Sequence, residues 1–136
     1  MQIYRNILAA EAEEELLKSG VKAAIFVQCL NRCIDEVRWV EKMAEKHKVI
    51  KGIVGGLDLT QEPEELRKQI RSTPLLLGVR HILDCEQEDW LTREDVQRGL
   101  KVVMEEGKVF DCLVRPPILK HVATIGGLEL ISTHIL

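Results

Sequence analysis

The 136-residue chain is 46% hydrophobic and 30% charged, and it carries a formal net charge of -3. This composition is that of one ordinary soluble domain, long enough to bury a core. A mild acidic excess with 4% aromatic residues offers neither the basic stripe nor the stacking surface that nucleic acids need, so a nucleic-acid partner is not expected.

No membrane partner is expected either. No apolar segment approaches the roughly 20 residues that span a bilayer, and residues 1–6 lack the basic-then-apolar order of a signal peptide. The sequence therefore predicts a cytoplasmic location. The four cysteines are too few for a disulfide scaffold in a chain of this size, and we expect reduced thiols, three of them buried.

The first part of the chain alternates helical and strand patterns. Amphipathic spacing over residues 7–19 predicts a helix, which Gly20 ends. The apolar run at 23–28 predicts a buried strand. A second amphipathic stripe over 32–47 predicts a helix with Asn31 as its N-cap.

The middle of the chain repeats this alternation. A strand is expected within residues 49–59, followed by a short helix that Thr60 caps and whose first turn accommodates Pro63. The run at 75–83 is continuous in Leu, Val and Ile and is bounded by turn residues. It predicts a strand covered on both faces, as in a parallel sheet.

The last third adds two further strands. Thr92 and Asp95 resemble a capping box, with Leu91 and Val96 as its hydrophobic staple, so a helix is expected to begin there. The remaining expected elements are a strand at 109–114, a brief helix at 118–125 and a strand from 128 to about 135.

These elements predict a single α/β domain over residues 1–136, with about five strands in βα units of roughly 25 to 30 residues. Two architectures fit this pattern: an open doubly wound sheet of flavodoxin type, and a section of a (β/α)₈ barrel. Both place function at the carboxyl ends of the strands. The polar residues expected near those ends are Gln28, Asp58, Arg80, His81, Arg115 and His134.

Arg80 and His81 are adjacent, so strand alternation sends them to opposite faces of the sheet. We expect Arg80 to face inward and bind a substrate carboxylate, with a structural salt bridge as the alternative. A substrate-binding His81 competes with the more common hydrogen-bonded structural histidine.

The other polar residues also have two interpretations. Gln28 either orients a substrate or caps a loop, and Asp58 either acts as a base or caps the loop that follows it. Arg115 either binds an anionic substrate or lies in a solvated turn. His134 is a catalytic candidate, and its alternative is a surface position near the end of the chain.

Five segments in order carry a resemblance to a known family: AIFVQ at 24–28, EVRWV at 36–40, GIVGGLDL at 52–59, LGVRHIL at 77–83 and FDCLVRP at 110–116. They resemble the amidohydrolase-related family, in particular its lactonase-like branch of sugar-lactone and pyrone-dicarboxylate hydrolases. The resemblance implies a partial (β/α)₈ TIM-barrel-like fold and hydrolysis of a lactone or cyclic ester by activated water. Its implied partner is a small-molecule carboxylate or lactone.

The resemblance also identifies missing parts. The family's Asp-x-His-x-His strand and its late catalytic aspartate have no counterpart here, and Ser132-Thr133-His134-Ile135 resembles the family's Asp-His segment with Thr133 in place of the aspartate. We therefore expect the middle of such a barrel, as a truncated or alternatively spliced form with impaired activity. The alternative function is a non-catalytic binding or interaction module.

The family includes members that use a divalent metal and members that do not, and this sequence offers no metal-ligand set of its own. The edges of an incomplete barrel predict self-association.

Overall fold

The computed structural model describes residues 6–29, 31–114, 116–122 and 131–135. Five parallel strands form one sheet in the order β1-β2-β3-β4-β5, so each strand pairs with its neighbours in sequence. The strands are β1 (Ala24–Val27), β2 (Ile50–Gly56), β3 (Leu76–Ile82), β4 (Val109–Val114) and β5 (Ile131–Ile135).

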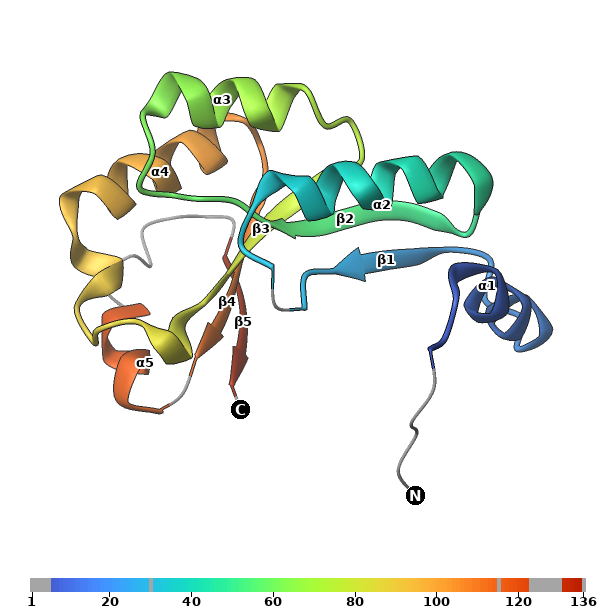
Figure 1. The fold of residues 1–136 in the computed structure, drawn as a ribbon. Helices are drawn as coiled ribbons and strands as arrows, with labels where there is room; N and C mark the ends of the chain where they lie inside the picture. Colours follow the sequence, from blue (N-terminus) through green and yellow to red (C-terminus); the bar gives the residue numbers. More distant parts are fainter. Residues whose placement is uncertain (1–5, 30, 115, 123–130, 136) are drawn as a thin grey trace.

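Helices alternate with these strands (Figure 1). They are α1 (Ala9–Lys18), α2 (Ile34–Lys46), α3 (Pro63–Arg71), α4 (Glu94–Glu105) and α5 (Pro116–Val122), with short 3₁₀ turns η1 (Leu83–Cys85) and η2 (Trp90–Thr92) between β3 and α4. All the strands and helices expected from the sequence are present, with shifts of a few residues at their ends.

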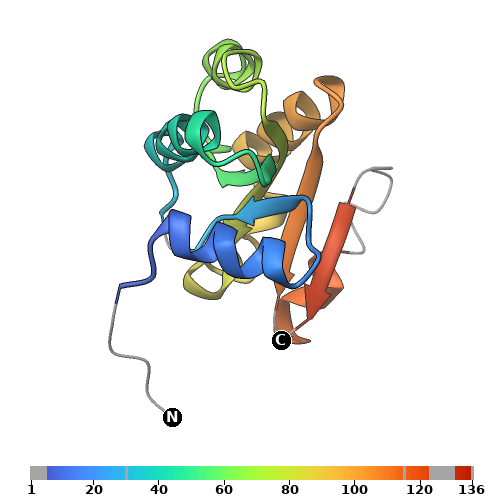
Figure 2. The same ribbon diagram turned by 90° about the vertical axis from the view of Figure 1, so that its right-hand side faces the viewer.

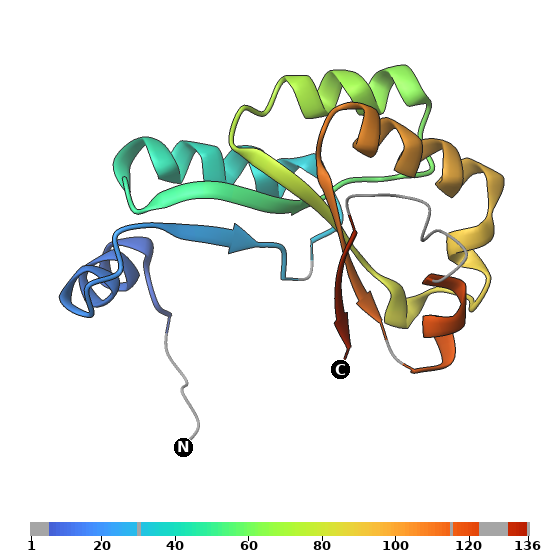
Figure 3. The same ribbon diagram turned by 180° about the vertical axis from the view of Figure 1, so that it is seen from behind.

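The strand order distinguishes between the two expected architectures. A doubly wound sheet reverses its strand order and carries helices on both faces. Here the order never reverses, and Figures 1 and 3 show α2, α3 and α4 on the same face of a curved sheet. The fold is therefore a section of a (β/α) barrel, and the flavodoxin-like alternative is not favoured.

The hydrophobic core lies between the sheet and this helix layer. Val79 and Phe110 are register partners on β3 and β4, and both are almost completely buried. α2 contributes Val37 and Val40, and Gly55 on β2 has no space for a side chain because a Cβ there would collide with Val37. The helix-covered face is thus closely packed.

The helix layer is also held together by charges. Arg67 and Arg71 of α3 both donate to Glu106, which follows α4, with N–O distances of 2.8 and 2.9 Å. The two guanidinium groups, that of Arg71 first, lower the pKa of Glu106 to about 2. Its carboxylate therefore stays ionised across the neutral and mildly acidic range.

The prediction of a capping box at the start of α4 is wrong. Thr92 belongs to η2, and its hydroxyl donates to the carbonyl of Asp89 at 2.7 Å, not to the first turn of the helix. The N-cap of α4 is Arg93, with no side-chain cap. The staple residues Leu91 and Val96 are nevertheless both buried.

The opposite, concave face of the sheet is more open. Ile25 pairs in register with Gly52, and a Cβ at Gly52 would meet the side chains of Leu77 and Ile25, so these residues share one face. Ile25 is 55% exposed and Leu77 is 44% exposed. Figure 2 shows α2, α3 and α4 arranged along the other side of the strands.

Candidate active site

The carboxyl ends of parallel strands meet at one edge of a sheet, and this is the edge where (β/α) barrels bind substrates. In this chain the edge is formed by the ends of β1 to β4 and by the loops that follow them. The expected site residues within the described part of the chain lie at or near this edge, but they fall into two groups on opposite faces of the sheet.

Arg80 lies on the concave face. It is the register partner of Asp111 on β4, and its guanidinium binds that carboxylate with Nη2–Oδ2 and Nε–Oδ2 distances of 2.6 and 2.8 Å. The side chains of Arg80 and Asp111 are 17% and 7% exposed. The structure therefore contains the ion pair that was the structural alternative for Arg80. An additional Nη1 contact reaches the backbone carbonyl of Gln28 at 3.4 Å.

Gln28 follows β1 directly and is 1% exposed. Its side-chain amide donates to the carbonyl of Asn31 at 2.6 Å, so it does cap the loop, but its side-chain oxygen is buried without a hydrogen-bond donor among the described residues. An unsatisfied buried acceptor costs about 1–3 kcal/mol. Gly56 lacks a side chain where a Cβ would collide with Asn31 and Gln28.

His81 lies on the helix-covered side, opposite Cys112 in register. Its ring stacks on Trp90 at a centroid distance of 4.0 Å and an interplanar angle of 9°. Burial lowers its pKa despite the nearby Glu86 carboxylate, so the neutral ring is favoured. Because a carboxylate only accepts, the 2.9 Å contact between Nε2 and Glu86 Oε1 places the proton on Nε2.

Glu86 links this histidine to a second loop. The same Oε1 atom accepts a hydrogen bond from Arg32 Nη1 at 2.9 Å. Arg32 is in the loop between β1 and α2, so the Arg32–Glu86–His81 chain joins the loops after β1 and β3. Sequence analysis missed Arg32 and Glu86 because no local pattern connects residues 54 positions apart.

These loops enclose a hollow of about 470 Å³ at the carboxyl edge. Its lining combines charged, amide, hydroxyl, thiol and aromatic groups: Asn31, Arg32, Cys33, Leu57, Asp58, Thr60, His81, Glu86 and Trp90. Asp58 accepts from both the amide and the hydroxyl of Thr60, at 2.9 and 2.7 Å, and thus has the loop-capping role considered for it.

The burial of the cysteines differs from the prediction. Only Cys112 of the four is buried, and burial raises the pKa of its thiol to about 12. Cys29, Cys33 and Cys85 are exposed, so the expectation of three buried thiols is wrong. Cys33 donates to Asn31 Oδ1 in the wall of the hollow. The strand pattern places Cys112 correctly but carries no information about thiols in loops.

The structure does not describe the side chains of two expected site residues. Arg115 lies outside the described residues. His134 is on β5, where its backbone is in register with Leu113 of β4.

The described ranges contain no group of three His, Cys, Asp or Glu side chains arranged to hold a metal ion. Among the helices of these ranges, none combines the length and apolarity needed to cross a membrane.

Comparison with protein-family models gave no match, and neither did a search of curated proteins. Solved structures do match. An amidohydrolase from Burkholderia multivorans with bound zinc superposes with a TM-score of 0.81 at 23% identity, over 96% of this chain and 47% of its own. An amidohydrolase from the same organism with bound HEPES gives 0.72 at 16% identity, over 95% of this chain and 59% of its own.

A third match is a probable 2-pyrone-4,6-dicarboxylic acid hydrolase from Acinetobacter baumannii with bound citric acid. It superposes with a TM-score of 0.72 at 14% identity, over 99% of this chain and 51% of its own. The chain thus spans about half the length of the solved structures it matches. The resemblance to amidohydrolases is confirmed at the level of the fold: the described strands and helices match about half of the (β/α) barrel in those structures.

Proposed function

We propose that this chain forms part of the substrate-binding wall of an amidohydrolase-type hydrolase that acts on lactones or related cyclic esters. The supporting observation is the hollow at the carboxyl edge of the strands, where Arg32, His81 and Glu86 converge. The active sites of characterised (β/α) barrels lie at this edge, among the loops that follow the strands. The matched structures are described as hydrolases, one of them a probable pyrone-dicarboxylic acid hydrolase.

The cations near the site support the proposed substrate class. Arg32 is 41% exposed along its side chain, and its described hydrogen bond uses Nη1 alone, which leaves Nε and Nη2 to receive a carboxylate or lactone carbonyl. The guanidinium of Arg80 is bound to the carboxylate of Asp111, so Arg80 would contact a substrate only while keeping this ion pair. Gln28 contributes a buried acceptor for a substrate donor group, and Arg115 and His134 remain proposed contacts.

Hydrolysis needs a base that delivers water and a group that stabilises the developing oxyanion. His81 is neutral but donates Nε2–H to Glu86, and Asp58 is engaged with Thr60, so neither is poised as a free base. The sequence also lacks an Asp-x-His-x-His pattern. We therefore propose that this chain binds substrate and has impaired or no turnover by itself.

The test combines binding and turnover. Calorimetric titration with a panel of aromatic and aliphatic lactones and dicarboxylates should give saturable binding to the chain, and the same panel should show hydrolysis no faster than the uncatalysed reaction. Arg32→Gln should weaken binding about tenfold, because a charge-assisted hydrogen bond to the ligand is lost.

Arg38→Gln is the matched control, since Arg38 is a 55% exposed arginine whose described partner is Asp35 at 3.8 Å, away from the hollow. Absence of saturable binding across the panel would contradict the proposed site. Efficient turnover by the chain would contradict the proposed impairment.

A further inference from the structure

The described lining of the hollow at the carboxyl edge contains more acidic than basic side chains. Its cation is Arg32, and its carboxylates are those of Asp58 and Glu86. The three residues come from three loops, which follow β1, β2 and β3 in turn. While the His81 ring is neutral, a ligand that carries a carboxylate therefore adds a negative charge to side chains that already include two carboxylates and one guanidinium.

One oxygen atom connects the cation to the histidine. Glu86 Oε1 accepts from Arg32 Nη1 and from His81 Nε2, both at 2.9 Å. The Glu86 side chain is 20% exposed, and the guanidinium of Arg32 supplies the positive charge beside it. A ligand carboxylate on Nε and Nη2 of Arg32 would share that charge. Glu86 then loses part of its compensation, and a proton on the His81 ring restores it.

The His81 ring has a nitrogen that can take this proton. Because Nε2–H donates to Glu86, Nδ1 is the basic nitrogen of the neutral ring. Among the described residues, none forms a hydrogen bond with Nδ1. Burial lowers the pKa of His81, so the ring of the free protein stays neutral at pH values where an exposed histidine begins to be protonated.

The groups that face the ring act on its protonation in both directions. The two carboxylates of the hollow favour the protonated ring, and the guanidinium opposes it. Trp90 is stacked on the ring and carries no charge. Cys112 lies opposite in register on β4, and because burial raises its pKa to about 12 its thiol is neutral. An anion that offsets the guanidinium charge therefore removes the main electrostatic opposition to protonation.

We propose that an anionic ligand enters this hollow together with a proton from the solvent, which His81 takes up on Nδ1 while Nε2–H stays bound to Glu86. The inference rests on the proposed function, because it concerns the same hollow and the same cation. Anionic ligands then bind more tightly as the pH falls below neutral, whereas an uncharged lactone gains nothing. His81 is thus a residue that selects between anionic and uncharged ligands.

The test uses isophthalate, a planar dicarboxylate that is largely ionised between about pH 5.5 and about pH 7.5. Calorimetric titration at about pH 6 in two buffers of different ionisation enthalpy measures the protons bound with each ligand. We expect a net uptake of up to one proton. The affinity should be about three- to tenfold higher at about pH 5.5 than at about pH 7.5, since a neighbouring charge shifts a histidine titration by about this much. His81→Gln should remove both effects.

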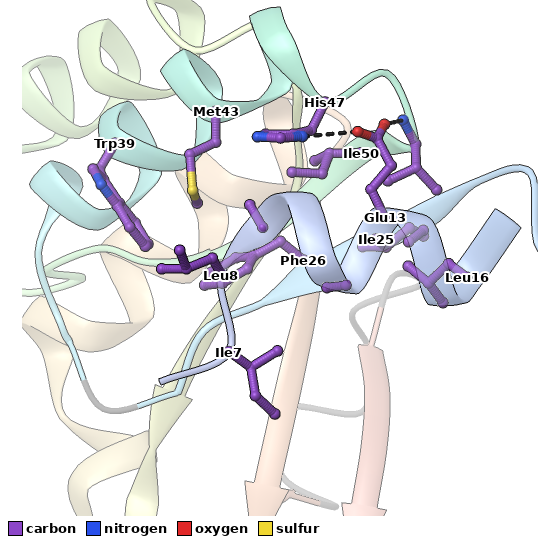
Figure 4. Close-up of a pocket in the computed structure, with 14 residues that line it drawn as sticks. Ile7, Leu8, Glu13, Leu16, Ile25, Phe26, Trp39, Met43, His47 and Ile50 are labelled. Carbon is purple, nitrogen blue, oxygen red and sulfur yellow. Dashed lines mark hydrogen bonds and ion pairs between the residues drawn. The ribbon is translucent and has the colours of Figure 1, made fainter. Parts of the chain in front are cut away.

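His47 provides the matched control. It lines a different hollow of about 310 Å³ beside β1, where its Nδ1 lies 2.8 Å from Glu13 Oε2 (Figure 4). It is therefore also a histidine paired with a glutamate, but away from Arg32. His47→Gln should leave the proton uptake unchanged.

NMR titration of the wild-type protein gives a second measurement that needs no variant. Saturation with isophthalate should raise the pKa of His81, because the bound anion favours the protonated ring. The His47 signals should not respond to the ligand. An unchanged His81 titration in the saturated protein would overturn the proposal.

Saturable binding of isophthalate without proton uptake would also overturn it, and would leave the proposed binding site intact. The same holds for proton uptake that survives in His81→Gln, and for an equal pH dependence with isophthalamide, the uncharged analogue. If no dicarboxylate binds at any of these pH values, the proposed site and the proton-linked binding are both overturned.

Discussion

The two faces of the sheet use their side chains in opposite ways. The face under α2, α3 and α4 is filled by Val79, Phe110 and Ile53, all at most 2% exposed. The concave face carries an ion pair, Arg80–Asp111, together with exposed Leu77 and Ile25. One strand, β3, contributes to both faces through adjacent residues. The difference indicates that the helix-covered face supplies most of the stability and that the concave face contributes less.

The largest effect is expected on the covered face. Phe110→Ala removes a 2% exposed aromatic ring from the core and should reduce the free energy of unfolding by about 3–5 kcal/mol, since it loses burial and leaves a cavity. Urea denaturation followed by circular dichroism measures this change. A loss below about 1 kcal/mol would show that the helix layer repacks and is not the rigid half of the molecule.

Variants of the Arg80–Asp111 ion pair test how much the concave face contributes to stability. Asp111→Asn leaves the 17% exposed Arg80 guanidinium without its counter-charge and should cost about 3 kcal/mol, as breaking buried pairs does. The double variant Arg80→Met, Asp111→Leu should recover much of that loss, because neither charge of the pair is then left without the other. If Asp111→Asn is as stable as the wild type, the pair is solvated and available to a substrate.

His81 makes the stability of the folded protein depend on pH. Burial lowers its folded-state pKa below the unfolded value of about 6.5. The folded state therefore binds the proton less readily than the unfolded state, and the stabilising contribution is complete above pH ~6.5 and is lost as the pH falls through the lowered folded-state pKa.

His81→Gln should remove this part of the acid-side decline in stability. Glu86→Gln should lower the pKa of His81 further, because the carboxylate favours the protonated ring. Titration of the His81 ring by NMR checks the direction. A rise in pKa on removing Glu86 would contradict the assigned hydrogen bond.

The smallest effect is expected for Leu77→Ala on the concave face. Leu77 is 44% exposed, so truncation should cost about 1 kcal/mol or less in a dilute sample. Urea denaturation measures this cost alongside that of Phe110→Ala, the reference for the covered face. An equal loss of stability in the two variants would contradict the contrast between the faces.

Local sequence patterns predicted the elements well because their signals lie within single segments. The apolar run at 75–83 became β3 (Leu76–Ile82), and alternation placed Arg80 and His81 on opposite faces. The choice between the two architectures depended on strand order, which is a property of long-range pairing and is not visible in any one segment.

The site was predicted less completely because its partners come from distant segments. Asp111 meets Arg80 through the β3–β4 register, 31 residues away, and Glu86 is shared between His81 and Arg32 across two loops. The capping prediction at Thr92 failed because the preceding 3₁₀ turn uses its hydroxyl. Local residue preference could not anticipate that competition.

The sequential strand order also determines how the chain can fold. Because every strand pairs with strands next to it in sequence, each new strand closes a loop of similar length, and the entropic cost of adding a βα unit stays nearly constant along the sheet. Folding can therefore spread from any βα unit to its neighbours, with low contact order for a parallel sheet. Each intermediate in such growth ends in a free parallel edge, to which the next strand along the chain can pair.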